Sequence, residues 1–319
     1  MTLIGTDLHA AAELLSTGQL VAIPTETVYG LAANALDASA VLQIFAVKQR
    51  PAFDPLIVHV SSVAALENYA AEVPAVAMAL AEKFWPGPLT LVLPKKEVIP
   101  DLVSSGLPTV GLRMPAHPLT LSLLQQLPFP LAAPSANPFG YISPTTARHV
   151  YDQLQDKIPY ILDGGPCTVG VESTIVGFEG GEVVVYRLGG LTLEELRKVA
   201  PFARLQLHTS SDPKAPGMLL SHYAPRKPFY TGDIDELVEQ HKGKRIAVLT
   251  FQRLVPSFPG LVATEVLSGN GHLAEAAMHL FAAMRRLDAL DVDVILSETV
   301  PAEGLGLAIN DRLRRASAV

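Results

Sequence analysis

Pro24-Thr25-Glu26-Thr27-Val28-Tyr29-Gly30 follows the apolar run Leu20-Val21-Ala22-Ile23, and this stretch decides how the first part of the chain folds. A short apolar run bounded by Pro and Gly is typical of a buried strand, and Pro24 has no N–H to continue a ladder. The strand therefore delivers a polar loop, in a chain that is 49% hydrophobic and only 17% charged. Such a loop is either a turn capped by Thr side chains or a place where a ligand binds.

The next segment carries two cations, Lys48 and Arg50. Residues 38–47 show the helical spacing of apolar side chains, and Asp37 is the expected N-cap. Pro51 disfavours a helical conformation for Arg50, and in extended chain residues two apart point to the same side. An ammonium beside a guanidinium suits a polyphosphate or a carboxylate. The alternative is two solvated cations at a helix C-terminus.

The two segments together resemble the signature of the YrdC-like family, the threonylcarbamoyl-AMP synthases. Three later segments match further motifs of that family in order: Pro134-Ser135-Ala136-Asn137, Glu172-Ser173-Thr174-Ile175-Val176 and Tyr186-Arg187-Leu188-Gly189. The remainder, from Gly217-Met218 through His222-Tyr223-Ala224-Pro225, resembles the extra domain of the family's long, two-domain form. Five ordered motifs are a specific signal, although none would be alone.

The resemblance implies an α/β fold: a YrdC-like twisted mixed sheet with helices, followed by a smaller C-terminal Rossmann-like parallel α/β domain. Two domains also follow from the 319 residues, which exceed the usual size of a single core. The alternation of strands and helices after residue 245 indicates a parallel sheet. The expected boundaries are 1–206 for the catalytic domain, 207–228 for a linker that acts as a lid, and 229–319 for the C-terminal domain.

The site residues follow from the resemblance, position by position. Lys48 and Arg50 would be catalytic. L-threonine would be held by Thr27, His59, Arg113 and Ser173. The ATP site would be lined by Arg50, Asp54, Thr109, Ala133, Ser135, Asn137, Ser143, Arg187 and Tyr223. Asp54 stands where the family often has a neutral Asn, so an anion near phosphate needs a metal or a cation beside it.

Arg113 is also conspicuous without the family, because it interrupts the apolar strand 110–115. Buried strands rarely contain an unpaired guanidinium, so Arg113 faces either an anionic ligand or an internal partner, with Glu26 among the candidates. In the family the matching arginine holds the threonine carboxylate. Ser173 is expected inside the strand 171–176.

The family's reaction joins L-threonine, bicarbonate and ATP into threonylcarbamoyl-adenylate and releases pyrophosphate. The product serves threonylcarbamoyladenosine formation in tRNA, 3′ of the anticodon, through a downstream transferase machinery. Mg²⁺ is expected on the ATP phosphates and no metal site in the protein. The linker segment around Tyr223 is expected to cover the cleft, because an adenylate hydrolyses if water enters.

Two other functions stay open at this point. One is the carbamoyl-transfer module of hydrogenase-maturation proteins, which carry Cys-rich and acylphosphatase segments that this chain lacks. The other is an RNA-binding module. Residues 1–205 hold 12 Lys and Arg against 18 Asp and Glu, which disfavours direct tRNA binding, since such affinity comes chiefly from neutralising phosphates.

Composition sets further limits. The single cysteine, Cys167, excludes an internal disulfide framework, has no base beside it in sequence, and is interpreted as a spare thiol. The start of the chain lacks a signal-peptide pattern, and no run reaches the roughly 18 apolar residues of a membrane helix. A cytoplasmic location with no membrane partner is therefore expected.

Overall fold

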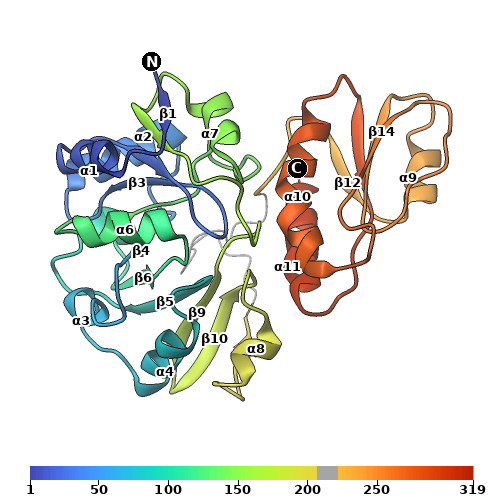
Figure 1. The fold of residues 1–319 in the computed structure, drawn as a ribbon. Helices are drawn as coiled ribbons and strands as arrows, with labels where there is room; N and C mark the ends of the chain where they lie inside the picture. The colour runs from blue at the N-terminus through green and yellow to red at the C-terminus, as the bar shows by residue number, and fades with distance from the viewer. Residues whose placement is uncertain (207–221, 319) are drawn as a thin grey trace.

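The structure is a computed structural model, and it describes residues 1–206 and 222–318. Two sheets organise the described chain (Figure 1). We call residues 1–206 the first domain and 229–318 the second domain. The predicted linker is described only in its last part, because 207–221 lie outside the described residues.

The first domain is built on one mixed sheet of eleven strands in the order β1-β8-β2-β3-β7-β4-β6-β5-β9-β10-β11. Parallel and antiparallel pairs alternate irregularly across it; for example β4 pairs with β6 in parallel, whereas β5 pairs with β6 antiparallel. The strands are β1 Leu3–Gly5, β2 Val21–Ile23, β3 Gly30–Asn34, β4 Ile57–His59, β5 Leu89–Pro94, β6 Thr109–Arg113, β7 Leu131–Ala132, β8 Tyr160–Leu162, β9 Thr174–Glu179, β10 Glu182–Arg187 and β11 Arg204–Leu205.

The helices of the first domain connect these strands and cover the sheet. They are α1 Leu8–Ser16, α2 Ala38–Lys48, α3 Leu66–Tyr69, α4 Ala75–Phe84, α5 Asp101–Ser104, α6 Pro118–Gln126, α7 Ala147–Leu154 and α8 Leu193–Arg197. The largest buried cluster packs α2 and α4 against the sheet, with Ile44, Leu80 and Leu91 among its members.

The second domain is a four-stranded, fully parallel sheet in the order β12-β15-β13-β14. Its elements are β12 Phe229–Thr231, α9 Ile234–Gln240, β13 Ile246–Thr250, β14 Leu261–Val266, α10 Leu273–Asp288, β15 Val294–Ser297 and α11 Leu305–Ala316. A mixed sheet followed by a smaller parallel α/β domain is the predicted fold class, which is confirmed. No helix of the described residues has the length and apolar character to cross a membrane.

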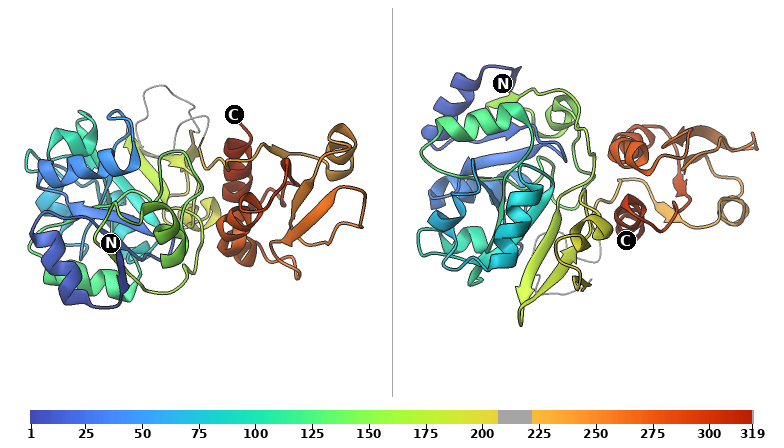
Figure 2. Two further views of the ribbon diagram at one scale, coloured as in Figure 1. Left: turned by 90° about the horizontal axis from the view of Figure 1, so that it is seen from above. Right: turned by 60° about the horizontal axis from the view of Figure 1, so that its bottom comes forward.

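Helices α10 and α11 lie between the second sheet and the first domain, as all three ribbon views show (Figures 1 and 2). One buried apolar cluster spans this boundary, joining Val28, Ile142 and Val171 of the first domain to Phe281 and Leu313 of the second. The two domains therefore share a core at the point where the motif loops of the first domain end.

The sequence prediction of α2 is confirmed, including its cap: the Asp37 carboxylate accepts hydrogen bonds from the N–H groups of Ser39 and Ala40. The expected extended stretch around Lys48 is wrong. Lys48 is the last residue of the helix, and Gln49 has φ 53° in the left-handed region, so the chain turns between Lys48 and Arg50.

Ser173 was also expected within a strand, yet β9 begins at Thr174. The residues before it form a loop that packs closely on the Gly189 backbone: a Cβ at Gly189 would lie 2.4 Å from the carbonyl carbon of Ser173. Glycine at that position therefore permits the approach of the two motif segments.

His59 ends β4 and is buried, at 2% exposure. Burial, and secondarily the positive charge of Arg113, lower the pKa of His59 to about 3. An unfolded histidine titrates near 6.5, so the unfolded chain binds more protons between these two pH values. The stability that His59 contributes is present above pH 6.5 and is lost as the pH falls.

We predict that the free energy of unfolding falls between pH 6.5 and 5 by about 2 kcal/mol through His59 alone. Denaturant titrations at several pH values measure this. His59→Gln should flatten the dependence, whereas His9→Gln, at an exposed helix position, should leave it unchanged. Equal slopes for wild type and His59→Gln would contradict the prediction.

Candidate active site

Most of the predicted site residues line one cavity of the first domain. They come from loops and strand ends that are far apart in sequence: the β2–β3 loop, the segment after α2, β4, β6, the loop after β7, the segment before β9, and β10. The predicted residues that line this cavity are Thr27, Arg50, His59, Arg113, Ala133, Ser135, Ser173, Arg187 and Tyr223. We call this space the motif cavity.

Arg113 meets the β2–β3 loop inside the motif cavity. Its Nη2 donates to Glu26 Oε1 at 2.6 Å and to Thr27 Oγ1 at 2.9 Å, and its Nε donates to the Gly87 carbonyl at 3.4 Å. The second Glu26 oxygen accepts from the Ala116 N–H at 3.0 Å. In this structure the internal ion pair considered from the sequence, between Arg113 and Glu26, is formed.

Ser173 and Arg187, which both line the motif cavity, are hydrogen-bonded to each other. Arg187 Nη2 donates to Ser173 Oγ and its Nε to the Ser173 carbonyl, both at 3.0 Å. Ser173 Oγ also lies 2.8 Å from Thr90 Oγ1. Burial lowers the pKa of Arg187 to about 10, which leaves its guanidinium charged at neutral pH.

Arg50 and Asp54 form a buried ion pair, with Arg50 Nη2 2.9 Å from Asp54 Oδ2. The Arg50 side chain also donates to the carbonyls of Asp54 and Pro55. Burial acts to raise the pKa of Asp54, while Arg50 and then Lys48 act to lower it. Asp54 stands where the family often has a neutral Asn, and Arg50 is the cation that lies beside its carboxylate.

Lys48 does not line the motif cavity. It is 1% exposed, and its Nζ donates to the carbonyls of Ser135, at 2.5 Å, and Asn137, at 2.6 Å. Burial, followed by the charge of Arg50, holds the pKa of Lys48 well below its usual value. The structure therefore places Lys48 behind the 135–137 loop, where it fixes the loop backbone.

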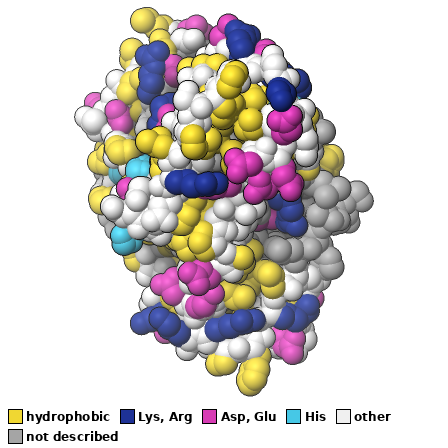
Figure 3. Space-filling view, turned by 90° about the vertical axis from the view of Figure 1, so that its right-hand side faces the viewer, with side chains coloured by type: hydrophobic (Ala, Val, Ile, Leu, Met, Phe, Trp, Pro, Cys, Tyr) yellow, Lys and Arg dark blue, Asp and Glu magenta, His cyan; other side chains and the backbone are white. Residues whose placement is uncertain are grey.

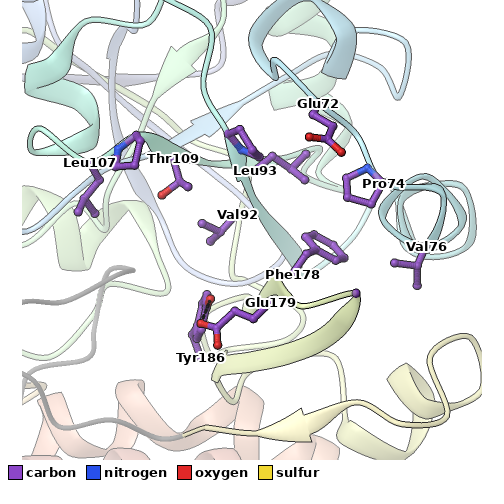
Figure 4. A pocket seen from close by; sticks show the side chains of 13 residues that line it. Glu72, Pro74, Val76, Val92, Leu93, Leu107, Thr109, Phe178, Glu179 and Tyr186 are labelled. Carbon is purple, nitrogen blue, oxygen red and sulfur yellow. Dashed lines mark hydrogen bonds between the residues drawn. The ribbon is translucent and has the colours of Figure 1, made fainter.

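Four other predicted residues do not line the motif cavity either: Asp54, Thr109, Asn137 and Ser143. Asn137 and Ser143 are buried in the loop after β7, and Asn137 Nδ2 donates to the carbonyls of Pro138 and Tyr141. Thr109, at the opposite end of β6 from Arg113, lines a second cavity of about 590 Å³ with Val92, Phe178 and Tyr186 (Figure 4). Arg113 follows Thr109 by four residue steps along the strand, so the two positions lie roughly 13 Å apart.

His222 and Tyr223 also border the motif cavity. The His222 ring meets Phe139 and Tyr223 edge-on, and the Tyr223 ring stacks on Phe281 of α10 at 5.6 Å between centroids. Tyr223 has φ 66°, a left-handed conformation that costs a non-glycine residue about 1–3 kcal/mol. The motif cavity is only about 50 Å³, whereas sites for nucleotide-sized ligands run to several hundred, so the site is closed here.

Sequence reasoning assigned no role to Glu172, which lines the motif cavity. Its Oε1 accepts from Ser143 Oγ at 2.6 Å, and its Oε2 accepts from Arg312 Nε at 3.0 Å. The only available signal was its place at the head of the motif that contains Ser173. Arg312, in α11, lies far outside every motif.

Cys167 is buried, and burial raises the pKa of its thiol to about 12, which agrees with the interpretation as an unreactive thiol. Among the described residues no group of three His, Cys, Asp or Glu side chains is placed to hold a metal ion. The site is thus a set of guanidinium groups, hydroxyls, two histidines and the Glu172 carboxylate around a small cavity.

Two family models match consecutive parts of the chain. Residues 13–189 match the Sua5/YciO/YrdC family model, described as telomere recombination, and residues 191–318 match the model of the threonylcarbamoyl-AMP synthase C-terminal domain.

Similar proteins cover nearly the whole chain. The threonylcarbamoyl-AMP synthase of Pyrococcus abyssi is 44% identical over 97% of this chain and 94% of its own length. The Bacillus subtilis threonylcarbamoyl-AMP synthase is 40% identical over 96% and 92% respectively. The crystal structure of P. abyssi Sua5 complexed with L-threonine matches with a TM-score of 0.93 at 42% identity, covering 99% of this chain and 97% of that chain.

The crystal structure of full-length HypF in the phosphate- and nucleotide-bound form is similar to part of this chain. It matches 58% of this chain but only 29% of its own, at 23% identity and a TM-score of 0.52, which shows a shared fold alone. Both family models and the full-length relatives agree with the sequence motifs: the chain belongs to the threonylcarbamoyl-AMP synthase family, and its activity is the ATP-dependent synthesis of threonylcarbamoyl-AMP for tRNA modification.

Proposed function

We propose that the motif cavity binds L-threonine, and that ATP binds from it along β6, so that the two substrates react with bicarbonate inside the first domain. The observation that carries this proposal is the convergence of Arg50, Arg113 and Arg187 on one small cavity. Three buried guanidinium groups in one place are costly unless anions meet them.

Threonine is proposed to bind at the Arg113 end. Its carboxylate would take the place of Glu26 on the guanidinium, while Thr27, Ser173 and the neutral His59 would meet the rest of the amino acid. A neutral imidazole matters here, because it does not draw the carboxylate away from Arg113. The Thr25 Oγ1 to Thr27 Oγ1 contact, at 2.8 Å, holds the Thr27 hydroxyl in position.

The ATP phosphates are proposed to meet Arg50 and Arg187, beside Ala133 and Ser135, with Tyr223 above them. Thr109 would then contact the far end of the nucleotide, since its roughly 13 Å separation from Arg113 along the strand suits one extended ligand. Asn137 and Ser143 would support this site from behind. Lys48 would act by fixing the 135–137 backbone.

The reaction requires two anions to approach each other. The threonine amine takes up carbon dioxide from bicarbonate, and a carbamate oxygen attacks the α-phosphorus while the bond to pyrophosphate breaks. The guanidinium groups would offset the repulsion, and they need no reorganisation because the protein already holds them in place. Correct positioning of two reactants contributes up to about 7–11 kcal/mol to lowering a barrier.

We propose that Mg²⁺ binds in this site together with the ATP phosphates. Asp54 Oδ1 is buried with no hydrogen-bond partner among the described residues, so it is the protein oxygen that we propose as a ligand. Glu172 is already bound by Ser143 and Arg312. Mg²⁺ typically takes one or two carboxylates plus phosphate oxygens, and it would neutralise phosphate charge.

We further propose that the protein works in the cytoplasm and hands its product to a separate tRNA threonylcarbamoyl transferase machinery. On the face drawn in Figure 3, basic and acidic side chains are interspersed. A surface that binds tRNA gathers positive charge, so this pattern supports weak or absent direct tRNA binding.

The overall reaction can be tested by leaving out one substrate at a time. Purified protein should release pyrophosphate from ATP only when both L-threonine and bicarbonate are present, because the carbamate is the nucleophile. A coupled pyrophosphate assay with each substrate omitted in turn measures this. Pyrophosphate release that is indifferent to threonine would refute the proposed function.

Arg113→Lys should weaken threonine binding by about tenfold or more, because an ammonium cannot reproduce the two-point contact of a guanidinium with a carboxylate. The affinity for ATP should change by less than about threefold, because the ATP contacts are proposed to lie on other residues. Calorimetry with each ligand separates the two. An equal loss for both ligands would contradict the assignment of Arg113 to threonine.

The closed position of Tyr223 supports the proposed lid formed by the linker. Tyr223→Ala should open the site to water, so that more free AMP and threonine appear per threonylcarbamoyl-AMP formed, whereas Tyr223→Phe keeps the ring and should leak less. Chromatographic product ratios measure this. Unchanged ratios in Tyr223→Ala would mean that Tyr223 only packs against Phe281.

A further inference from the structure

Arg312 is a buried cation that the second domain contributes to the boundary of the active site. It projects from α11, and it ranks first by volume among the side chains with less than 2% exposure. Its Nε donates to Glu172 Oε2 at 3.0 Å and its Nη1 to Asp311 Oδ2 at 3.1 Å. Its guanidinium carbon lies 5.2 Å from the centre of the Tyr223 ring.

These contacts connect Arg312 to the motif cavity without placing it there. Glu172 and Tyr223 both line the cavity, and Arg312 does not. The other Glu172 oxygen accepts from Ser143 at 2.6 Å. A single guanidinium thus bears on the carboxylate that holds Ser143 and on the aromatic ring that closes the site.

A buried guanidinium is retained at a large desolvation cost, and an apolar side chain would often be at least as stable in its place. Asp311 is shared, because Arg314 and Arg315 also donate to it, at 2.6 and 2.9 Å. Asp311 alone therefore does not account for Arg312, and the carboxylate specific to Arg312 is Glu172.

Another arginine of the second domain, Arg285, contacts the first domain without reaching the motif cavity. Arg285, in α10, donates to the carbonyls of Ile142 and Ser143 and to Gln153 Oε1. These bonds join the domains through two backbone carbonyls and the side chain of Gln153, and none of them involves a residue that lines the motif cavity. Arg312 instead donates to the side chain of Glu172, which lines the motif cavity.

We propose that Arg312 is a positioning residue for the synthesis of threonylcarbamoyl-AMP, which holds Ser143 through Glu172 and holds Tyr223 by direct contact with its ring, where the nucleotide binds. The second domain thereby supplies a part of the active site. This inference rests on the proposed function of the motif cavity. It assigns Arg312 to the nucleotide side, since Ser143 and Tyr223 belong to the proposed ATP site.

The test compares Arg312→Met with Arg314→Met in the full chain. Arg314 bonds the same Asp311 but its side chain is 63% exposed and does not reach Glu172, so it is a matched control. Arg312→Met should raise the KM for ATP about tenfold, the usual scale for losing a buried charged contact, and change the KM for threonine far less. Arg314→Met should behave as wild type.

A double-mutant cycle with Glu172→Gln decides whether the effect passes through Glu172. The double variant Glu172→Gln/Arg312→Met should lose less ATP affinity than the sum of the two single losses, because residues that act through one contact are not additive. Arg312→Lys, which keeps the charge but not the two-carboxylate geometry, should recover part of the ATP affinity.

Several outcomes would overturn the inference. One is a lower melting temperature of Arg312→Met with wild-type kcat and KM values, which would mean a structural role only. Another is full additivity in the cycle. If Arg312→Met does not fold, wild-type kinetics of Glu172→Gln and Arg312→Lys would be equally decisive. Lack of synthase activity in the wild-type protein would instead refute the proposed function of the cavity.

Discussion

The structure depends on the burial of four guanidinium groups around one small space. Arg50, Arg113, Arg187 and Arg312 are each 9% exposed or less. Removing a guanidinium from water is expensive, so each must meet an acceptor of good geometry. The chain provides them as Asp54, Glu26, the Ser173 hydroxyl and carbonyl, and Glu172. The mixed sheet is the scaffold that brings the first-domain residues of this set together, because they lie on loops and strands that are far apart in the sequence.

Under the proposed function, this arrangement makes threonine binding an exchange of anions at Arg113. A substrate carboxylate that reaches Arg113 meets a guanidinium already bound to Glu26, so the net gain is the difference between the two contacts. The exchange favours specificity, since a ligand without a second set of contacts for Thr27, His59 and Ser173 would not displace an internal carboxylate. It also explains how a site for two anionic substrates remains folded without them.

Local features of this fold could be predicted from the sequence, and long-range ones could not. The N-cap at Asp37 and the family motifs follow from spacing and residue type over short distances. Lys48 was misplaced because a single left-handed residue, Gln49, redirects the chain, and Ser173 because Ser-Thr suits a strand as well as the loop before it. Arg312 was missed because its partner is 140 residues away and no motif marks α11.

The central claim is that Glu26, the internal partner of Arg113, occupies the place of the substrate carboxylate. A crystal structure with L-threonine bound tests it most directly at Arg113. The account predicts the threonine carboxylate within hydrogen-bonding distance of the Arg113 guanidinium, with the 2.6 Å contact to Glu26 broken or lengthened. Threonine bound elsewhere, with the Arg113–Glu26 pair intact, would contradict it.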